Sequence, residues 1–326
     1  MSLDDRPLAV FLMGPTASGK TALACALADR YPLGLVSVDS ALVYRGLDIG
    51  SAKPDPAMLA RYPHELVDIR DPGQPYSAAD FRADALAAMT RVREAGRVPL
   101  LVGGTGLYFR ALQRGLSDLP EADPGVRERL GTEAARLGWA ELHRRMAALD
   151  PVAGARIRPG DAQRIQRALE VMELSGRTLS ELQQGGSRER FPYRVLKLGL
   201  LPDDRKTLHE RIARRFDEMI AAGFLDEVRA LRARGDLHPD LPAIRAVGYR
   251  QAWEYLDGQG DATNFRDRGI YATRQLAKRQ ITWLRGELDA RTFDPDRGDP
   301  WPESDKALGQ FLGMPTASRS TLPAGV

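Results

Sequence analysis

Short apolar runs alternate with helical patterns over the first third of the chain. Four runs have the length of strands and end in glycine or polar residues: LAVFLMG (8–14), LGLVSVDS (33–40), HELVDIRD (64–71) and RVPLLVGGTG (97–106). Patterns at 21–30 and 77–95 indicate helices between them. Buried strands separated by helices predict an α/β protein whose parallel sheet is flanked by helices on both faces.

A long stretch without a strand signal follows. Helical patterns fill 124–150 and 159–184, and the next strand-like run, YRVLKLGLL, comes only at 193–201. We therefore predict an all-helical insertion between two halves of one core. Further helical patterns lie at 208–235, which Gly223 divides, at 243–256 and at 267–288.

These patterns divide the chain into four parts. We place the first part of the core at 1–118, the helical insertion at 119–192 and the second part of the core at 193–300. Residues 301–326 hold a short helix after Trp301 and then a tail rich in Pro, Ser, Thr and Gly, which we expect to be disordered.

Composition limits the class of protein. The chain has 326 residues, 43% hydrophobic and 28% charged, which is enough for a large core. No apolar run reaches the roughly 18 residues of a membrane span, and the N-terminus lacks the pattern of a signal peptide. We expect a cytoplasmic monomer that does not bind membranes. Cys25 is expected in the core, and the four histidines lack the spacing of metal ligands.

Basic residues are clustered although the net charge is only +3. Four arginines lie between residues 156 and 167, where the only acid is Asp161. A second cluster faces one acid, Asp267, and contains Arg266, Arg268, Arg274, Lys278, Arg279 and Arg285. One such cluster alone is typical of a solvated helix face. Two of them in a chain with a phosphate loop favour a polyanionic partner.

A phosphate-binding loop joins the first strand to the first helix. The pattern G-x-x-x-x-G-K-[ST] is matched at every fixed position by Gly14, Pro15, Thr16, Ala17, Ser18, Gly19, Lys20 and Thr21. Backbone amides and the start of the helix attract an anion, Lys20 adds a full charge, and the Thr21 hydroxyl can bind Mg²⁺. We predict a site for the phosphate groups of a ligand here.

The usual companion of this loop in ATP-using enzymes is missing. Those enzymes have a second apolar strand that ends in a metal-binding aspartate, whereas VPLLVGG ends in glycines and Thr105. Asp39 is the only carboxylate that ends a strand near the loop. It could hold Mg²⁺ through water or act as a base on an acceptor, and the loop sequence does not choose between these roles.

Six motifs in order resemble one family, the bacterial tRNA dimethylallyltransferases, and the resemblance extends to about residue 297. The motifs are GPTASGKT (14–21), SVDSALVYRGLDIGSAKP (37–54), GGTGLY (103–108), DAQRIQRALE (161–170), AVGYRQ (246–251) and TRQLAKRQITWLR (273–285). The resemblance implies a P-loop NTPase-like core and transfer of a dimethylallyl group from dimethylallyl diphosphate to N6 of adenosine 37 in tRNA.

The resemblance also implies roles for individual residues. Asp39 would be the general base, while Lys20, Thr105 and Mg²⁺ at Thr21 would stabilise the leaving pyrophosphate. Arg215 would assist, although a solvated surface arginine is an equal reading. The target base must be turned out of the anticodon loop to reach Asp39.

The implied contacts with the tRNA anticodon stem-loop come from several segments. Beside Asp39 and Thr105 they are Ser40, Ala41, Leu42, Arg127, Gln163, Arg164, Ile165, Gln166, Arg167, Arg245, Ala246, Val247, Gly248, Tyr249, Arg250, Arg274, Lys278 and Arg279.

Three other functions fit parts of the sequence. A small-molecule phosphotransferase would explain the loop, but it offers no use for the arginine-rich insertion. An RNA-binding protein that only senses a nucleotide would leave Asp39 and Thr105 without a task. An enzyme that prenylates free adenine nucleotides would not need the RNA-facing helices.

Overall fold

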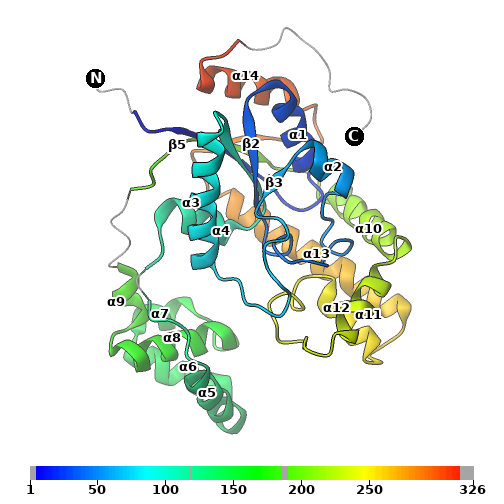
Figure 1. Cartoon of the computed structure of the whole chain (residues 1–326). Helices are drawn as coiled ribbons and strands as arrows, with labels where there is room; N and C mark the ends of the chain where they lie inside the picture. The colour runs from blue at the N-terminus through cyan, green and yellow to red at the C-terminus, as the bar shows by residue number, and fades with distance from the viewer. Residues whose placement is uncertain (1–4, 118, 185–189, 316–326) are drawn as a thin grey trace. The chain divides into compact units, whose positions relative to one another are not determined.

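A parallel sheet forms the centre of the larger part of the protein. The computed structural model describes residues 5–117, 119–184 and 190–315. The sheet lies among the helices of this unit (Figure 1), and its six strands have the order β3-β2-β4-β1-β5-β6. They are β1 (Leu8–Met13), β2 (Leu33–Val38), β3 (His64–Glu65), β4 (Val98–Gly103), β5 (Arg194–Leu200) and β6 (Arg291–Phe293). All their pairings are parallel, as the sequence predicts.

Helices cover both faces of this sheet. Val10 and Leu12 of β1 pack with Leu23 and Leu27 of α1 (Lys20–Arg30) in a core that also holds Leu308 of α14 (Trp301–Leu312). Because side chains alternate along a strand, the residues between them face the other way. There Phe11 contacts the ring of Phe109 in α4 (Gly106–Arg114), with centroids 5.1 Å apart, and α3 (Ala78–Glu94) packs on β2 and β4.

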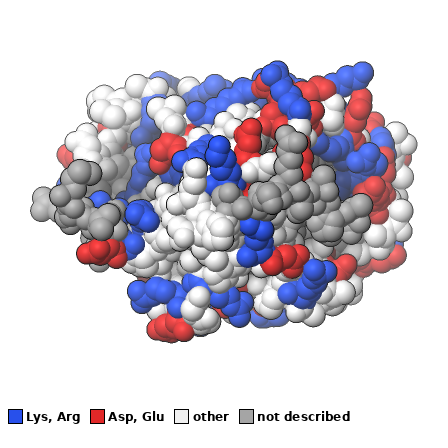
Figure 2. Space-filling view, turned by 90° about the horizontal axis from the view of Figure 1, so that it is seen from above, with Lys and Arg blue, Asp and Glu red and all other residues white. Residues whose placement is uncertain are grey.

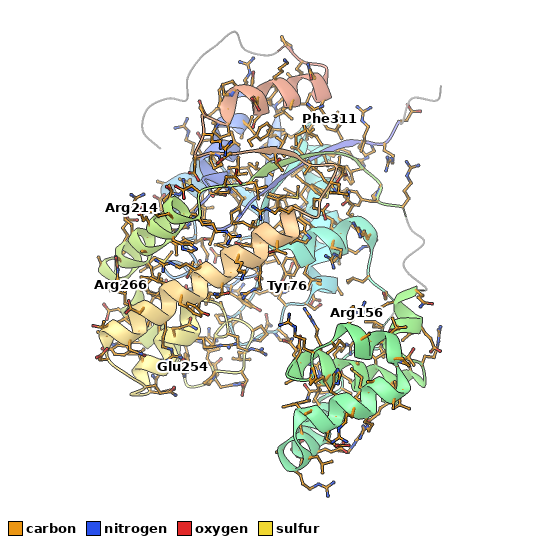
Figure 3. All side chains as sticks on the ribbon, turned by 180° about the vertical axis from the view of Figure 1, so that it is seen from behind. Tyr76, Arg156, Arg214, Glu254, Arg266 and Phe311 are labelled. Atoms are coloured by element: carbon orange, nitrogen blue, oxygen red, sulfur yellow. The ribbon has the colours of Figure 1, made fainter. Side chains whose placement is uncertain are left out.

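Four helices complete the larger unit after β5. They are α10 (Arg205–Ala221), α11 (Phe224–Ala233), α12 (Tyr249–Leu256) and α13 (Ala262–Leu284). The break at Gly223 is confirmed, since its φ of 98° suits glycine and separates α10 from α11. Near the start of α13, Arg266 pairs with Asp217 of α10 at 2.6 Å, and Arg268 pairs with Glu254 of α12 (Figure 3).

Residues 111–191 form a second compact unit, which is all-helical in its described residues. It contains α5 (Pro124–Leu137), α6 (Trp139–Leu149), α7 (Pro151–Arg156), α8 (Ala162–Ser175) and α9 (Leu179–Gln184). Its own core includes Leu130, Met146 and Leu169. Buried Asp150 caps α7 by accepting the Ala153 amide and ties α9 to it by accepting the Ser180 amide, both at 2.9 Å.

Several predicted elements differ from the structure. The run at 64–71 gives a strand of only two residues, because Leu66 and Asp68 adopt positive φ angles that end the extended chain. The helix predicted from 243 begins at Tyr249, after Gly248 with φ of 92°. Strand β6 and helix α2 (Pro56–Arg61) were not predicted. The helix predicted after Trp301 is confirmed as α14, and the tail beyond residue 315 lies outside the described residues.

The described helices include none with both the length and the apolar character of a membrane span.

Candidate active site

The phosphate loop leaves the carboxyl end of β1 in the left-handed conformations that curl a chain around an anion. Ala17 has φ of 61° and Gly19 has φ of 84°, and α1 begins at Lys20 with free N–H groups in its first turn. The Ser18 hydroxyl is buried and has no hydrogen-bond partner among the described residues. Backbone and hydroxyl donors therefore converge here, as a diphosphate site requires.

Lys20 lies in the loop with its ammonium folded back. Its Nζ donates to the Pro15 carbonyl at 2.8 Å. Burial lowers the pKa of Lys20 to about 8, with a further lowering by Arg215 and an opposing rise from Asp39. Lys20 is thus a cation whose charge depends on pH near neutrality and which an anionic ligand would stabilise.

Asp39 follows β2 and turns the chain at the same edge of the sheet. Its Oδ1 accepts the amides of Ala41 at 2.8 Å and of Leu42 at 3.4 Å. Within the described chain no hydrogen bond reaches its Oδ2. The turn therefore fixes the carboxylate and leaves one oxygen for a ligand, and Ala41 and Leu42 are half-buried beside it while Ser40 is exposed.

Thr105 reaches this site because β4 lies between β1 and β2. Gly103 is paired with Met13 on one side and Val38 on the other, and the Thr105 amide donates to the Val38 carbonyl at 3.3 Å. The phosphate loop, Asp39 and Thr105 thus share the carboxyl edge of three adjacent strands, where ligands of parallel sheets bind.

Arg215 on α10 belongs to the same group. Burial lowers the pKa of its guanidinium, and Asp39 opposes that change, so the two lie within electrostatic reach. The charges of Asp39 and Arg215 also shift the pKa of Lys20, in opposite directions. Arg215 is half-buried, and its assistance to the reaction stays a prediction.

Helix α13 closes the site through residues to which the sequence assigned no role. Gln280 Oε1 accepts the Thr16 amide at 2.9 Å, and Trp283 stacks on Phe109 with centroids 5.6 Å apart. Both residues lie inside the motif TRQLAKRQITWLR. A glutamine on the face of α13 that also carries Ala277 and Leu284 was the signal that could have revealed the contact.

The residues at the loop suit a magnesium ion carried by a phosphate ligand. Mg²⁺ commonly takes one or two protein oxygens and completes its shell with phosphate and water. The Thr21 hydroxyl at the start of α1 can supply such an oxygen, as the loop pattern predicts. The described residues contain no cluster of three or more His, Cys, Asp or Glu that could hold a metal by itself.

The loop after Asp39 is fixed by α11 and α12. Glu227 Oε2 accepts the amides of Asp48 at 2.9 Å and Ile49 at 2.7 Å, and its Oε1 accepts the Tyr249 hydroxyl at 2.6 Å. Burial, followed by the Glu227 charge, raises the pKa of Tyr249. A Cβ at Gly50 would lie 2.1 Å from the Phe224 ring, so this approach requires glycine.

This anchoring corrects part of the predicted RNA surface. Tyr249 is 1% exposed and Gly248 is buried, so neither presents a side chain to a ligand. Ala246 and Val247 are half-buried, whereas Arg245 and Arg250 are exposed and remain available.

In the helical unit, two of the predicted RNA contacts, Arg127 and Arg167, are bonded to the same carboxylate. Glu170 is fully buried and accepts bonds from Arg127 at 2.8 Å and Arg167 at 2.7 Å. Burial opposes its ionisation, but these arginines and the Asp123 amide together lower the pKa of Glu170. Arg127 and Arg167 are therefore held in place by a buried carboxylate.

The remaining predicted residues of that unit differ in exposure. Ile165 is a core residue with 0% exposure, which corrects its prediction as a contact. Gln166 donates to the Arg127 carbonyl at 2.9 Å. Gln163 and Arg164 are exposed, and Arg164 pairs with Asp161 at 3.3 Å.

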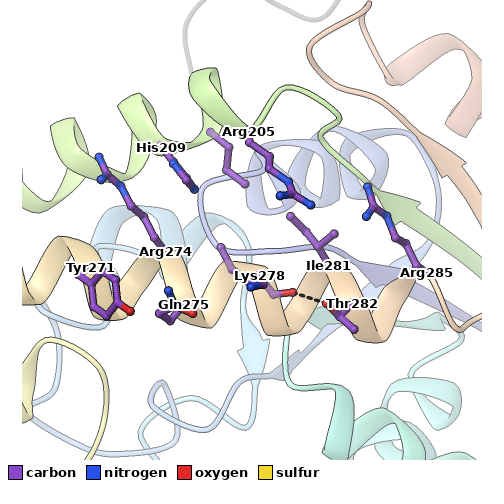
Figure 4. Close-up of a pocket in the computed structure, with 11 residues that line it drawn as sticks. Arg205, His209, Tyr271, Arg274, Gln275, Lys278, Ile281, Thr282 and Arg285 are labelled. Carbon is purple, nitrogen blue, oxygen red and sulfur yellow. Dashed lines mark hydrogen bonds between the residues drawn. The ribbon is translucent and has the colours of Figure 1, made fainter.

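A groove with a volume of about 370 Å³ runs between α10 and α13 (Figure 4). Leu208, Ala277 and Ile281 give it apolar walls, and its basic residues are Arg205, His209, Arg274, Lys278 and Arg285. Burial and then the charges of Arg274 and Arg205 lower the pKa of His209. Positive charge is thus concentrated along one apolar groove.

Pairing with acids leaves only part of the second basic cluster free. Among the described residues Arg274, Lys278 and Arg279 form no ion pair, and the Arg274 Nε is buried without a partner. The face seen from above in Figure 2 is different, because Lys and Arg lie there among Asp and Glu. The groove is therefore the better candidate for a polyanion.

Comparison with known proteins gives consistent matches. A model of the family described as IPP transferase matches residues 42–287. The tRNA dimethylallyltransferase of Alkalilimnicola ehrlichii is 65% identical over 308 residues, covering 94% of this chain and 96% of the relative. That of Xanthomonas axonopodis pv. citri is 61% identical over 326 residues, covering 98% and 99%.

Solved structures have the same fold. The tRNA isopentenylpyrophosphate transferase of Bacillus halodurans is 35% identical, with a TM-score of 0.67 and coverage of 95% of this chain and 96% of that one. A eukaryotic dimethylallyltransferase that acts on tRNA has a TM-score of 0.77 over 96% of this chain and 81% of its own, and at 21% identity it supports the fold alone.

The lowered pKa of Lys20 predicts how pyrophosphate binding depends on pH. Affinity should fall by up to about tenfold per pH unit above pH 8, because Lys20 loses its charge there. Isothermal titration with inorganic pyrophosphate between pH 6.5 and 9.5 measures this. Lys20→Arg, which stays charged, is the control for changes in pyrophosphate itself, and identical pH profiles for both proteins would contradict the prediction.

Proposed function

The chain belongs to the IPP transferase family, and from this premise we propose that it transfers the dimethylallyl group of dimethylallyl diphosphate to N6 of adenosine 37 in the tRNA anticodon loop. The proposal rests on one observation: the phosphate loop and Asp39 lie at the same edge of the sheet. The strand between them, β4, ends in glycine and not in a metal-binding aspartate. The site thus combines a loop that can hold a diphosphate with a carboxylate that can act as a base.

Pyrophosphate is the leaving group in this reaction. N6 of the adenine attacks carbon 1 of the donor, the bond from that carbon to the bridging oxygen breaks, and pyrophosphate departs with the electron pair. Lys20, the amides of Ser18–Thr21, the Thr105 hydroxyl and Arg215 stabilise the charge that develops on it. The Thr21 hydroxyl would hold a Mg²⁺ ion, which would supply further stabilisation of this charge.

Asp39 takes the proton from the adenine amino group. That nitrogen is a poor nucleophile because its lone pair is delocalised into the ring, so a carboxylate that accepts its N–H both orients and deprotonates it. The turn formed with the Ala41 and Leu42 amides supports this role, since it holds the carboxylate while Oδ2 stays free for the base.

Basic residues that are exposed or half-buried supply the surface for the RNA. The groove residues Arg274 and Lys278, with neighbouring Arg279, suit a phosphate backbone, and Arg245 and Arg250 extend the set. In the helical unit, Arg127, Gln163 and Arg164 are exposed. Arg127 is also preorganised by Glu170, which lowers the entropy cost of binding.

The test is transfer itself, with Asp39→Asn as the diagnostic variant. Wild-type protein, dimethylallyl diphosphate and unmodified tRNA should yield N6-dimethylallyladenosine at position 37, without ATP hydrolysis. Asp39→Asn should lower the transfer rate by about 10² to 10⁴ while both substrates still bind, because it cannot accept a proton. Nucleoside mass analysis and binding titrations measure these effects. Lost pyrophosphate binding in the variant would make Asp39 a metal-site residue, and ATP turnover with unchanged tRNA would refute the proposal.

Binding of tRNA should depend strongly on salt. If Arg274 and Lys278 each meet a phosphate, replacing both by Ala should reduce the slope of log K against log[salt] by about one to two units. Arg229→Ala, which removes an exposed arginine that is paired with Asp226, is the matched control. An unchanged slope in the double variant would mean that this groove faces solvent in the complex.

A further inference from the structure

Helix α13 touches both glycine-rich turns of the active site. Thr16 in the phosphate loop donates its amide to Gln280 Oε1 at 2.9 Å. A Cβ added at Gly104 would lie 2.2 Å from Gln280 Nε2 and 2.9 Å from the Gly14 carbonyl oxygen. One glutamine side chain therefore fills the space where the loop after β1 approaches the turn after β4.

The next turn of the helix repeats this close approach. A Cβ at Gly106 would lie 2.3 Å from the Trp283 ring, which itself stacks on Phe109. The glycines on both sides of Thr105 thus make room for α13. This contact fixes the backbone on either side of Thr105, whose own amide is bonded to Val38.

Because of the bond to Gln280, the amides of the phosphate loop are not equivalent. The Thr16 amide donates to Gln280 and is therefore not a donor to an anion, whereas the amides in the first turn of α1 remain free to bind one. Gln280 Nε2 has no acceptor within the described chain and lies against the turn that leads to Thr105. The Gln280 side chain is therefore placed to keep the phosphate loop and the turn at Gly104 in fixed positions.

We propose that Gln280 is a positioning residue of the diphosphate site: its amide joins the phosphate loop at Thr16 to the turn at Gly104 and so fixes the distance between the loop donors and Thr105. The inference rests on the proposed function for the identity of the donor. It assigns to Gln280 of α13 a part in fixing the site, although the phosphate loop and Thr105 lie more than a hundred residues earlier in the chain.

Two substitutions separate this role from general stability. Gln280→Met keeps the length of the side chain but removes its acceptor, so pyrophosphate affinity should fall about tenfold at every pH. Gln280→Glu keeps the acceptor for Thr16 and adds a charge near the diphosphate. Its affinity should approach the wild-type value when the new carboxyl is protonated and should fall about tenfold or more as pH rises through that titration.

Inorganic pyrophosphate titrations from pH 5 to 8 on the full chain give the readout, with thermal unfolding as a check on folding. Gln310→Glu makes the same charge change at an exposed position of α14 and is the matched control. Variants that fold and bind pyrophosphate like wild type, or that lose only RNA affinity, would overturn the inference. If the wild-type protein itself bound no pyrophosphate, the proposed function would fail instead.

Discussion

The close packing of α13 on the carboxyl edge of the sheet is the constraint on which the site depends. Gly104 and Gly106 have no room for a side chain, because Gln280 and Trp283 occupy that space. The sheet alone brings the ends of β1, β2 and β4 together, but it leaves the turns that follow them free in conformation. A helix from the far end of the chain holds those turns, and its groove side carries Arg274 and Lys278.

The site contains two cationic side chains that burial affects, Lys20 and Arg215, and one carboxylate close to both, Asp39. This excess of positive charge determines the electrostatics of the site. Lys20 and Arg215 both have pKa values lowered mainly by burial. Asp39 opposes this lowering for both residues, and Glu218 opposes it for Arg215. A site with this balance favours an anionic ligand, since the ligand restores the interactions that the cations lost with water. The same balance suits a reaction in which negative charge grows on a departing group rather than on a phosphorus under attack.

Local patterns were enough to predict most of the fold. The apolar runs predicted β1, β2, β4 and β5, and the phosphate-loop pattern placed Lys20 at the start of α1. Strand β6 was missed because its residues Arg291–Phe293 are few and largely exposed, so they carry no apolar signal. The contact of Gln280 with Thr16 spans 264 positions. The helical period places Gln280 on the face of α13 that carries Ala277 and Leu284, but it does not identify the partner of Gln280. The resemblance implied a tRNA contact for Tyr249, whereas the structure buries this side chain and bonds its hydroxyl to Glu227.

The central claim is that the phosphate loop holds a leaving group, so that carbon and not phosphorus is attacked. Dimethylallyl diphosphate labelled with oxygen-18 at the oxygen that bridges carbon 1 and phosphorus tests this directly. After a single turnover with tRNA, mass analysis should find the label entirely in pyrophosphate and the dimethylallyl group on the adenine nitrogen. Label retained in dimethylallyl alcohol, with phosphate or pyrophosphate on the acceptor, would mean cleavage at phosphorus and would contradict the account.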